Sequence, residues 1–432
     1  MRHVGPALSL LALAACSQPR LTGLDCHLPL RKLAVEHASD AALGGAGGAP
    51  TFADDLSRAL APSPLGGGGA ARQELLVLSG GGQWGAFGAG FLNGWKDLPD
   101  FKVVTGVSTG SLQGTFALLG NQNVPADRKL AVADDFPPLD PAAARRNRED
   151  AAIGYTITRE ATLLKKRGGG LIGAVRHGSA GDLAPLRERL RIMITPDTLR
   201  AVADVAGPRA EAGRRFYVGV VDIDTGEAYA VDMSEIARRV KAPGADATAI
   251  RAACDCYIET LIASSSAPLG ALPVFIDGHM LVDGGVRFGV FLEEVARSVE
   301  VANRRAPVTR STGPIRVNLI INGDMAISAA PEPRPDKWNL IDLASRSEAV
   351  LVDQIYKFSA MRVEDYARQV GAFRFAYVHD QDRHKFDGKT CREWNTIDEA
   401  DDPLQFHPNF MRCLIDYGRK RAENGQWDKI AP

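Results

Sequence analysis

A serine between two glycines stands in a pattern typical of nucleophilic catalysis. Residues Gly106 to Gly110 read Gly-Val-Ser-Thr-Gly and fit the G-x-S-x-G nucleophile elbow, with Ser108 at the centre. In such an elbow a sharp turn between strand and helix exposes the hydroxyl, and the amino end of the helix faces the reacting oxygen. Because 44 of the 432 residues are glycine, the match alone is weak. Its place after an apolar strand and before a helix supplies the context that the motif needs.

Three consecutive glycines, Gly80, Gly81 and Gly82, end another predicted strand. Such a run lets backbone N–H groups turn toward one point, where they can stabilise an oxyanion or bind a phosphate. A triphosphate-binding loop would end in Gly-Lys-Ser/Thr, but the chain continues Gly85-Ala86-Phe87. The loop also matches the G-x-G-x-x-G pattern of dinucleotide-binding sites. Such a site needs an acidic residue at the end of the second strand, but here the acidic residues about twenty positions later precede that strand. An oxyanion hole is the remaining interpretation.

Asp283 is the third candidate, at the end of a short apolar strand and followed by two glycines. Asp-Gly is the commonest turn dipeptide, so Asp283-Gly284 alone predicts a turn. The nearby Asp277-Gly278 is assigned to a plain hairpin turn. A carboxylate at a strand end with glycines behind it can instead be approached closely by another loop, as a catalytic residue would be. The neighbouring motifs have to decide between a turn residue and a catalytic one.

The order of these blocks resembles that of the patatin-like phospholipase family. An apolar strand runs into Gly-Gly-Gly-x-x-Gly, and Gly-x-Ser-x-Gly follows one βα unit later. Ala-Ser-Ser-Ser-Ala-Pro at residues 263–268 then precedes the strand that ends in Asp-Gly-Gly. The resemblance covers about residues 73 to 325, and three ordered blocks are much more specific than any one of them.

The resemblance implies an α/β fold with a three-layer, mostly parallel sheet flanked by helices. It further implies a Ser-Asp dyad, in which Ser108 attacks an acyl ester, Asp283 accepts its proton, and Gly80, Gly81 and Gly82 form the oxyanion hole. An exposed aspartate with a pKa of about 3.9 is a poor base, and we expect burial in an apolar cleft to raise that pKa. The expected substrate is a phospholipid, with neutral acylglycerol or another acyl ester behind it, and no cofactor or metal is expected.

Two departures from the family pattern concern recognition of the head group. Trp84 stands where the family usually has Arg or Lys, and ordinary packing is the favoured interpretation of this tryptophan over an interfacial role. Arg287 follows Asp-Gly-Gly where Asn or Pro is common; it could restore positive charge at the mouth of the site, but a surface position is the usual one for such an arginine.

Two other functions stay open. An α/β-hydrolase esterase would use a Ser-Asp-His triad, and His379, His384 and His407 follow Asp283 in the required order. Against it, the glycine loop lies only one βα unit before Ser108. The second alternative is a catalytically silent, lipid-binding surface lipoprotein.

The strands and helices that must position these residues follow from the apolar patterns. The expected strands are 74–78, 101–105, 216–221, 228–231, 274–276, 280–282, 315–321 and 373–378. The expected helices are 86–95, 111–119, 183–190, 198–205, 258–263 and 341–362. Residues 121–180 are irregular, and we interpret them as helical and loop segments that cover the site. The catalytic domain spans 73–330, and a helical and polar extension spans 331–432.

The amino terminus predicts export. Arg2 and His3 precede the apolar run Ala7 to Ala15, whose nine residues are too short to span about 30 Å of hydrocarbon. We interpret residues 1–15 as a signal peptide. Its end, Leu-Ala-Ala-Cys, resembles the lipobox of bacterial lipoproteins, which implies a lipidated Cys16; an ordinary secretory signal is the alternative. The following residue is Ser17 and not aspartate, which favours the outer membrane of a bacterial cell envelope.

The stretch from Cys16 to residue 72 is predicted to be a tether because its second half is dominated by Ala, Gly, Pro and Ser. Among the other cysteines, a Cys391–Cys413 disulfide is favoured because both lie in the polar C-terminal region. Cys254 and Cys256 are taken as structural, since no Cys/His pair lies near enough to complete a zinc site. The 51 basic and 52 acidic residues argue against nucleic-acid binding. The expected partners are the lipid substrate and the membrane, and the oligomeric state is open.

Overall fold

The computed structural model describes residues 20–33, 51–60, 73–130, 144–168, 177–207, 213–291, 315–324 and 373–428, with scattered helical residues between 294 and 358. The strands of the main sheet are β1 (Leu30–Lys32), β2 (Glu74–Leu78), β3 (Val103–Val107), β6 (Arg215–Asp222), β7 (Ala228–Asp232), β8 (Val274–Ile276), β9 (His279–Asp283), β10 (Arg316–Ile320) and β11 (Phe373–Ala376). The helices are α3 (Phe52–Ala59), α4 (Gly85–Gly94), α5 (Thr109–Leu119), α6 (Asn147–Tyr155), α8 (Ala184–Met193), α9 (Pro196–Ala206), α10 (Met233–Arg238), α11 (Ala247–Ser264), α14 (Cys391–Asp398) and α15 (Pro408–Glu423).

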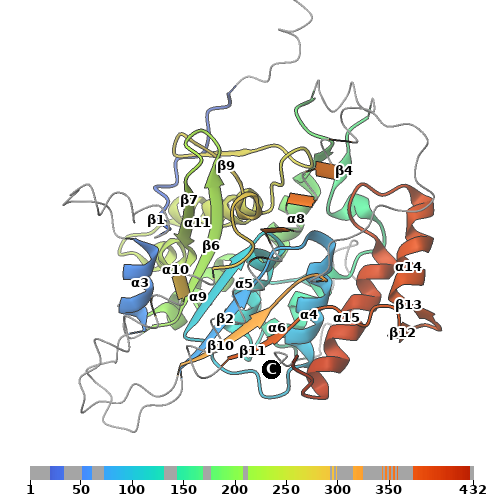
Figure 1. Ribbon diagram of the computed structural model, residues 1–432. Coiled ribbons are helices and arrows are strands. Elements are labelled where there is room, and N and C mark those ends of the chain that lie inside the picture. Colours follow the sequence, from blue (N-terminus) through green and yellow to red (C-terminus); the bar gives the residue numbers. More distant parts are fainter. Residues whose placement is uncertain are drawn as a thin grey trace, which may run out of the picture.

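Within these residues, nine strands form one mixed sheet with a parallel centre (Figure 1). The order is β1-β7-β6-β3-β2-β10-β11, and β9 pairs with β6 and with β8. Strands β6, β3, β2, β10 and β11 run parallel to one another, whereas β1, β7, β8 and β9 pair antiparallel with their neighbours. The carboxyl ends of the central strands therefore meet at one edge, where sites in open α/β sheets usually form.

Alternate residues of the central strands face two separate cores, as the pleat requires. In β2, Leu76 and Leu78 pack with α4, α11 and α15, whereas Leu75 and Val77 pack with Phe52 of α3 on the opposite face. This gives helix, sheet and helix layers. The expected α/β class with a mostly parallel, helix-flanked sheet is confirmed.

The element boundaries follow the sequence expectations most closely around the candidate motifs. Strand β2 has the predicted limits, and β3 begins two residues later than predicted. Thr195 caps α9 by accepting a hydrogen bond from the Thr198 amide, with proline at the first helical position. Helix α11 is much longer than the predicted 258–263, because Asp246 caps a start at Ala247. The predicted helix 341–362 lies mostly outside the described residues.

Two parts of the predicted tether are folded. Strand β1 adds to the edge of the sheet beside β7. Helix α3 starts at the Thr51 cap and buries Phe52, Leu56 and Ala59 against the sheet, so its apolar face overrides the disorder that the flanking Gly and Pro suggested. Residues 1–19, with the predicted signal peptide and Cys16, lie outside the described residues. No helix in the described part is long and apolar enough to cross a membrane.

The boundary at residue 330 stays a prediction, but the segments on either side are packed together. Strand β11 pairs with β10, and α15 lies directly along α4 (Figure 1). Phe87 of α4 contacts Tyr417 of α15, with ring centroids 5.5 Å apart. The region expected to end as a polar tail thus contributes a buried helix to the core.

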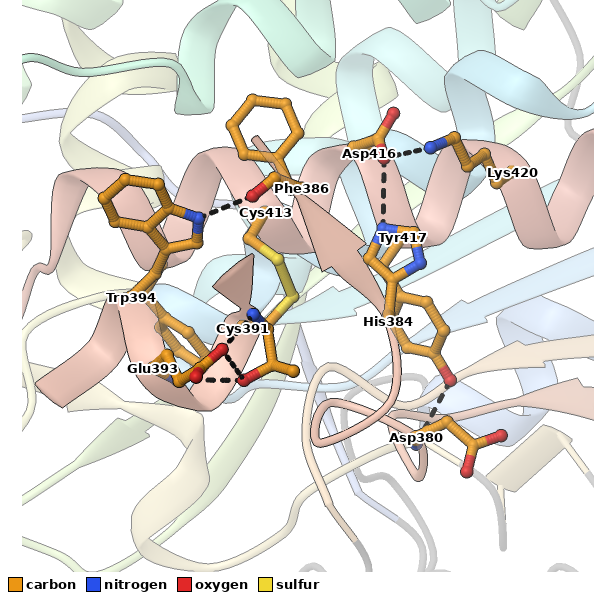
Figure 2. Close-up of a disulfide and its surroundings, with 12 residues drawn as sticks. Asp380, His384, Phe386, Cys391, Glu393, Trp394, Cys413, Asp416, Tyr417 and Lys420 are labelled. Carbon is orange, nitrogen blue, oxygen red and sulfur yellow. Dashed lines mark hydrogen bonds and ion pairs between the residues drawn. A yellow bond between two sulfur atoms is a disulfide. The ribbon is translucent and has the colours of Figure 1, made fainter. Parts of the chain in front are cut away.

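Two disulfides are present in the described chain. The favoured Cys391–Cys413 bridge is confirmed and connects α14 to α15 (Figure 2). The second bridge, Cys26–Cys256, ties the amino-terminal segment to α11, and Cys254 is free and buried. The structural interpretation of Cys256 is therefore confirmed.

Candidate active site

Ser108 lies at the turn between β3 and α5 in a strained backbone conformation. Its φ is 51° and its ψ is −127°, which an L-residue rarely adopts outside a functional turn. The two glycines of the motif leave space for this turn. A Cβ atom at Gly106 would lie 2.4 Å from the Gly110 carbonyl oxygen, and one at Gly110 would lie 2.6 Å from that of Leu78. The G-x-S-x-G pattern is therefore explained by close backbone packing around the elbow.

The register of β6 brings Asp283 to the same place. The last residue of β3, Val107, pairs with Gly219, and the last residue of β9, Asp283, pairs with the next residue, Val220. Strand β7 pairs with one edge of β6 at these positions, so β3 and β9 both pair with the opposite edge. Along that edge the carboxyl end of β3 meets the carboxyl end of β9. A Cβ atom at Gly284 would lie 3.0 Å from Val107 Cγ1. The turn after β9 is thus in contact with the end of β3.

The end of α11 holds both strand ends. The Ser108 amide donates to Ser264 Oγ at 3.0 Å, and Ser264 Oγ in turn donates to the Gly219 carbonyl at 2.7 Å. The Asp283 amide donates to the Ser266 carbonyl at 3.1 Å. The Ala-Ser-Ser-Ser-Ala-Pro block, chosen from sequence only by its order, therefore connects the two candidate catalytic residues.

One pocket contains both side chains. Ser108 is 8% exposed and Asp283 is 6% exposed, so each reaches the pocket but is otherwise covered. The Asp283 carboxylate accepts a hydrogen bond from the Gly285 amide at 2.7 Å, which fixes its orientation. The pocket wall is mostly apolar and includes Leu112, Leu163, Leu183, Leu186, Leu190, Met193 and Phe406.

The glycine loop reaches this pocket with its third member, Gly82. The Gly80 amide donates a hydrogen bond to the Gly289 carbonyl at 3.4 Å. Gly81 and Gly82 have φ values of 140° and 55°, and within the described chain neither amide has a hydrogen-bond acceptor. A Cβ atom at Gly81 would lie 1.8 Å from the Asn322 carbonyl oxygen, so glycine is required there. Gly82 lines the pocket with Ser108.

The three histidines that a triad would need have other partners. His384 Nε2 is 3.0 Å from an Asp416 carboxylate oxygen, and its pKa is lowered because burial outweighs that carboxylate (Figure 2). His379 lies between Asp380 and Asp428, and the His407 ring contacts the Asn395 carbonyl. None of the described residues that line the pocket is a histidine.

The two departures from the family pattern have plain structural roles. Trp84 packs edge-on against Phe410 of α15, with ring centroids 5.1 Å apart, so the packing interpretation is confirmed. The Arg287 side chain is exposed and donates to the Gly226 carbonyl, as expected for a surface arginine.

Several residues of the site carried no signal in the sequence. The Tyr155 hydroxyl donates to the Thr109 carbonyl at 2.8 Å, and burial raises the pKa of this tyrosine, so the ring stays neutral. Arg189 is 4% exposed, lines the pocket, and donates to the Gly154 and Thr156 carbonyls at 3.0 Å each. Gln405 enters from the C-terminal region. None belongs to a recognisable motif, so only the fold could reveal them.

One cluster of possible metal ligands lies elsewhere in the described chain. Asp25, His27 and Asp277 have ligand atoms within 4.8 Å of one another. The Asp277 carboxylate already accepts the amides of Cys26, His27 and Leu28 at 2.6, 2.9 and 2.6 Å. This turn, predicted as a plain hairpin, therefore also fixes the amino-terminal segment that leads to β1.

One known protein family matches about half of this chain. A family model described as patatin-like phospholipase matches residues 76–296. Among solved structures, VipD from Legionella pneumophila is similar, with a TM-score of 0.28 and 10% sequence identity over 95% of this chain and 72% of that chain. A likeness this distant carries no argument about function. No curated protein matches the chain.

Proposed function

Because the chain belongs to the patatin-like phospholipase family, whose members hydrolyse lipid acyl esters, we propose that it cleaves such esters with Ser108 as nucleophile and Asp283 as general base. The observation that carries the proposal is the end-to-end meeting of β3 and β9 beside β6, since it brings the two residues into one pocket. The absence of histidine among the described pocket residues favours this dyad over a triad.

The reaction proceeds in two steps on these groups. Ser108 Oγ attacks the ester carbonyl carbon while its proton passes to the Asp283 carboxylate, and that proton then leaves with the alcohol as the C–O bond breaks. Water attacks the acyl-enzyme, gives its proton to Asp283, and releases the fatty acid as the serine recovers its hydrogen. Each tetrahedral oxyanion is stabilised by the Gly81 and Gly82 amides and the amino end of α5. The Gly80 amide is left out because it is directed to Gly289.

The pocket wall supports a lipid as the substrate. Its apolar side chains come from α5, from α8 and the residue before it, from the α6–β4 connection and from the segment before α15, and they can bury an acyl chain beside Ser108. A phospholipid is the first choice, and a neutral acylglycerol is the second. We further propose that Cys16 anchors the protein by lipid in a bacterial cell envelope, with the outer membrane favoured.

A hydrolysis screen over lipid classes tests this function. The parent protein, Ser108→Ala and Asp283→Asn are compared on phospholipids, acylglycerols and a soluble acyl ester. We expect turnover by the parent on at least one lipid ester and loss of at least about 100-fold in each variant. A folded parent that binds lipid vesicles but hydrolyses no ester would instead indicate a silent lipid-binding protein.

A further inference from the structure

The segment Asp402–His407, between η7 (Glu399–Asp401) and α15, forms part of the pocket wall. Gln405 and Phe406 line the pocket together with Ser108 and Asp283. The family match ends at residue 296, so this part of the wall comes from outside the family domain. The site is therefore completed by a segment that lies outside the matched family domain.

A single carboxylate holds this segment in place. The side chain of Glu160, at the start of η4 (Glu160–Thr162), accepts three successive backbone amides: Leu404 at 2.9 Å, Gln405 at 2.6 Å and Phe406 at 2.8 Å. Hydrogen bonds to a charged acceptor are stronger than those between neutral groups. Next along the segment, the His407 amide donates to Gln83 Oε1 at 3.0 Å, and Gln83 directly follows Gly82. The segment is thus attached to the glycine loop itself.

The helices on either side restrain the same segment. The Cys391–Cys413 disulfide joins α14 to α15 and closes the stretch that contains it (Figure 2). At the end of α14, the Asp398 carboxylate accepts the Asn409 and Phe410 amides at 2.8 and 2.9 Å, which fixes the start of α15. Lys166 pairs with Asp402 at 2.6 Å at the outer end. A loop restrained at both ends and in the middle can place a side chain reproducibly.

The side chain that this arrangement places at the site is Gln405. Its Nε2 atom would lie 2.6 Å from a Cβ atom at Gly82, so the amide group lies directly against the glycine loop. In the part of the chain that the structure describes, this amide has no hydrogen-bond partner, although the backbone around it is fully held. A primary amide carries two N–H donors. The Gln405 amide is therefore available to a substrate group that enters beside Gly81 and Gly82.

We infer that Gln405 is a further catalytic residue, whose side-chain amide donates a hydrogen bond to the ester group of the substrate, and that Glu160 is a positioning residue which acts through it. This inference rests on the proposed function, because the ester would occupy the pocket of Ser108. It adds a side-chain donor to the two backbone donors of the oxyanion hole. Two features then favour glycine at position 82. Its φ is 55°, and Gln405 fills the space that a Cβ atom would need.

The test uses the full protein and a soluble acyl ester, with kcat and KM measured separately. Gln405→Met keeps the side-chain length but removes the N–H donor. Gln405→Ala removes the donor and shortens the side chain. We expect each to lower kcat/KM by about 10-fold, mostly through kcat, as for one hydrogen bond to a developing charge. Gln426→Met is the matched control, since Gln426 is also exposed in the C-terminal region but lies outside the pocket, and it should keep the parental kcat/KM.

The Glu160→Gln variant tests whether Glu160 acts by positioning Gln405 or only by stabilising the fold. If Glu160 acts through Gln405, Glu160→Gln lowers kcat/KM, but the double variant with Gln405→Met is no worse than Gln405→Met alone. A parental kcat/KM in Gln405→Met, or fully additive losses in the double variant, would overturn the inference while leaving the Ser108–Asp283 proposal intact. A folded parent that neither hydrolyses esters nor reacts with a fluorophosphonate would overturn both.

Discussion

Replacement of Ser264 by alanine should destabilise the elbow through two specific hydrogen bonds. Ser264 Oγ accepts from the Ser108 amide at 3.0 Å and donates to the Gly219 carbonyl at 2.7 Å, and the residue is fully buried. Alanine leaves both backbone groups without a partner, and each unpaired buried group costs about 1–3 kcal/mol. We therefore expect the free energy of unfolding to fall by about 2–4 kcal/mol. Because the φ of 51° at Ser108 is itself strained, kcat should also fall, by more than about tenfold.

Ser265 provides the matched control for the stability measurement. It is the next residue, at the cap of α11, but its buried hydroxyl has no hydrogen-bond partner among the described residues. Ser265→Ala breaks no hydrogen bond and removes an unpaired buried hydroxyl, so it should not lower the free energy of unfolding. Urea unfolding of both variants, followed by circular dichroism, gives the two values. Equal losses in the two variants would refute the assignment of Ser264 as the residue that holds the elbow.

Three further predictions concern stability, pH and location. Burial raises the pKa of Asp232 to about 6, above its unfolded value of about 3.9. The folded state therefore holds this proton to higher pH, and the free energy of unfolding should fall by about 2 kcal/mol between pH 4 and pH 7. Asp232→Asn should remove that part of the pH dependence of urea unfolding, and an unchanged profile would contradict it. The Cys391→Ser/Cys413→Ser variant, which opens a disulfide with a sequence separation of 22, should lose about 3 kcal/mol of stability under oxidising conditions; a change below about 1 kcal/mol would argue against a stabilising bridge. In bacterial expression, Cys16→Ser should move the protein from the membrane fraction to the soluble fraction, and membrane retention of this variant would contradict the lipid anchor.

The chemistry-bearing blocks were predictable from sequence because each depends on local backbone geometry. Glycines around Ser108 and at Gly81 are required by contacts of about 2–3 Å, and such requirements leave a visible pattern in one short stretch. The strands and helices next to these blocks were placed within a few residues for the same reason. The parallel centre of the sheet followed from the βα alternation.

The parts of the fold and of the site that were not predictable from sequence depend on tertiary contacts, which leave no local pattern. The meeting of Ser108 with Asp283 requires the register of β6, which is set by pairings with three other strands. The Gln405 backbone amide donates to Glu160, which lies 245 positions earlier in the chain, and no local pattern announces this contact. Helix α3 was missed because Gly- and Pro-rich flanks hid a short apolar face, and α15 because its many charged residues masked the buried side that packs on α4. In each case long-range packing outweighed local composition.

The most direct measurement is the rate at which a fluorophosphonate probe forms a covalent adduct with the folded protein, with the modified residue identified by mass spectrometry. We predict an adduct on Ser108 in the parent, no adduct in Ser108→Ala, and labelling slowed by at least about 100-fold in Asp283→Asn. An adduct on another residue, or labelling of Asp283→Asn at the parental rate, would contradict it.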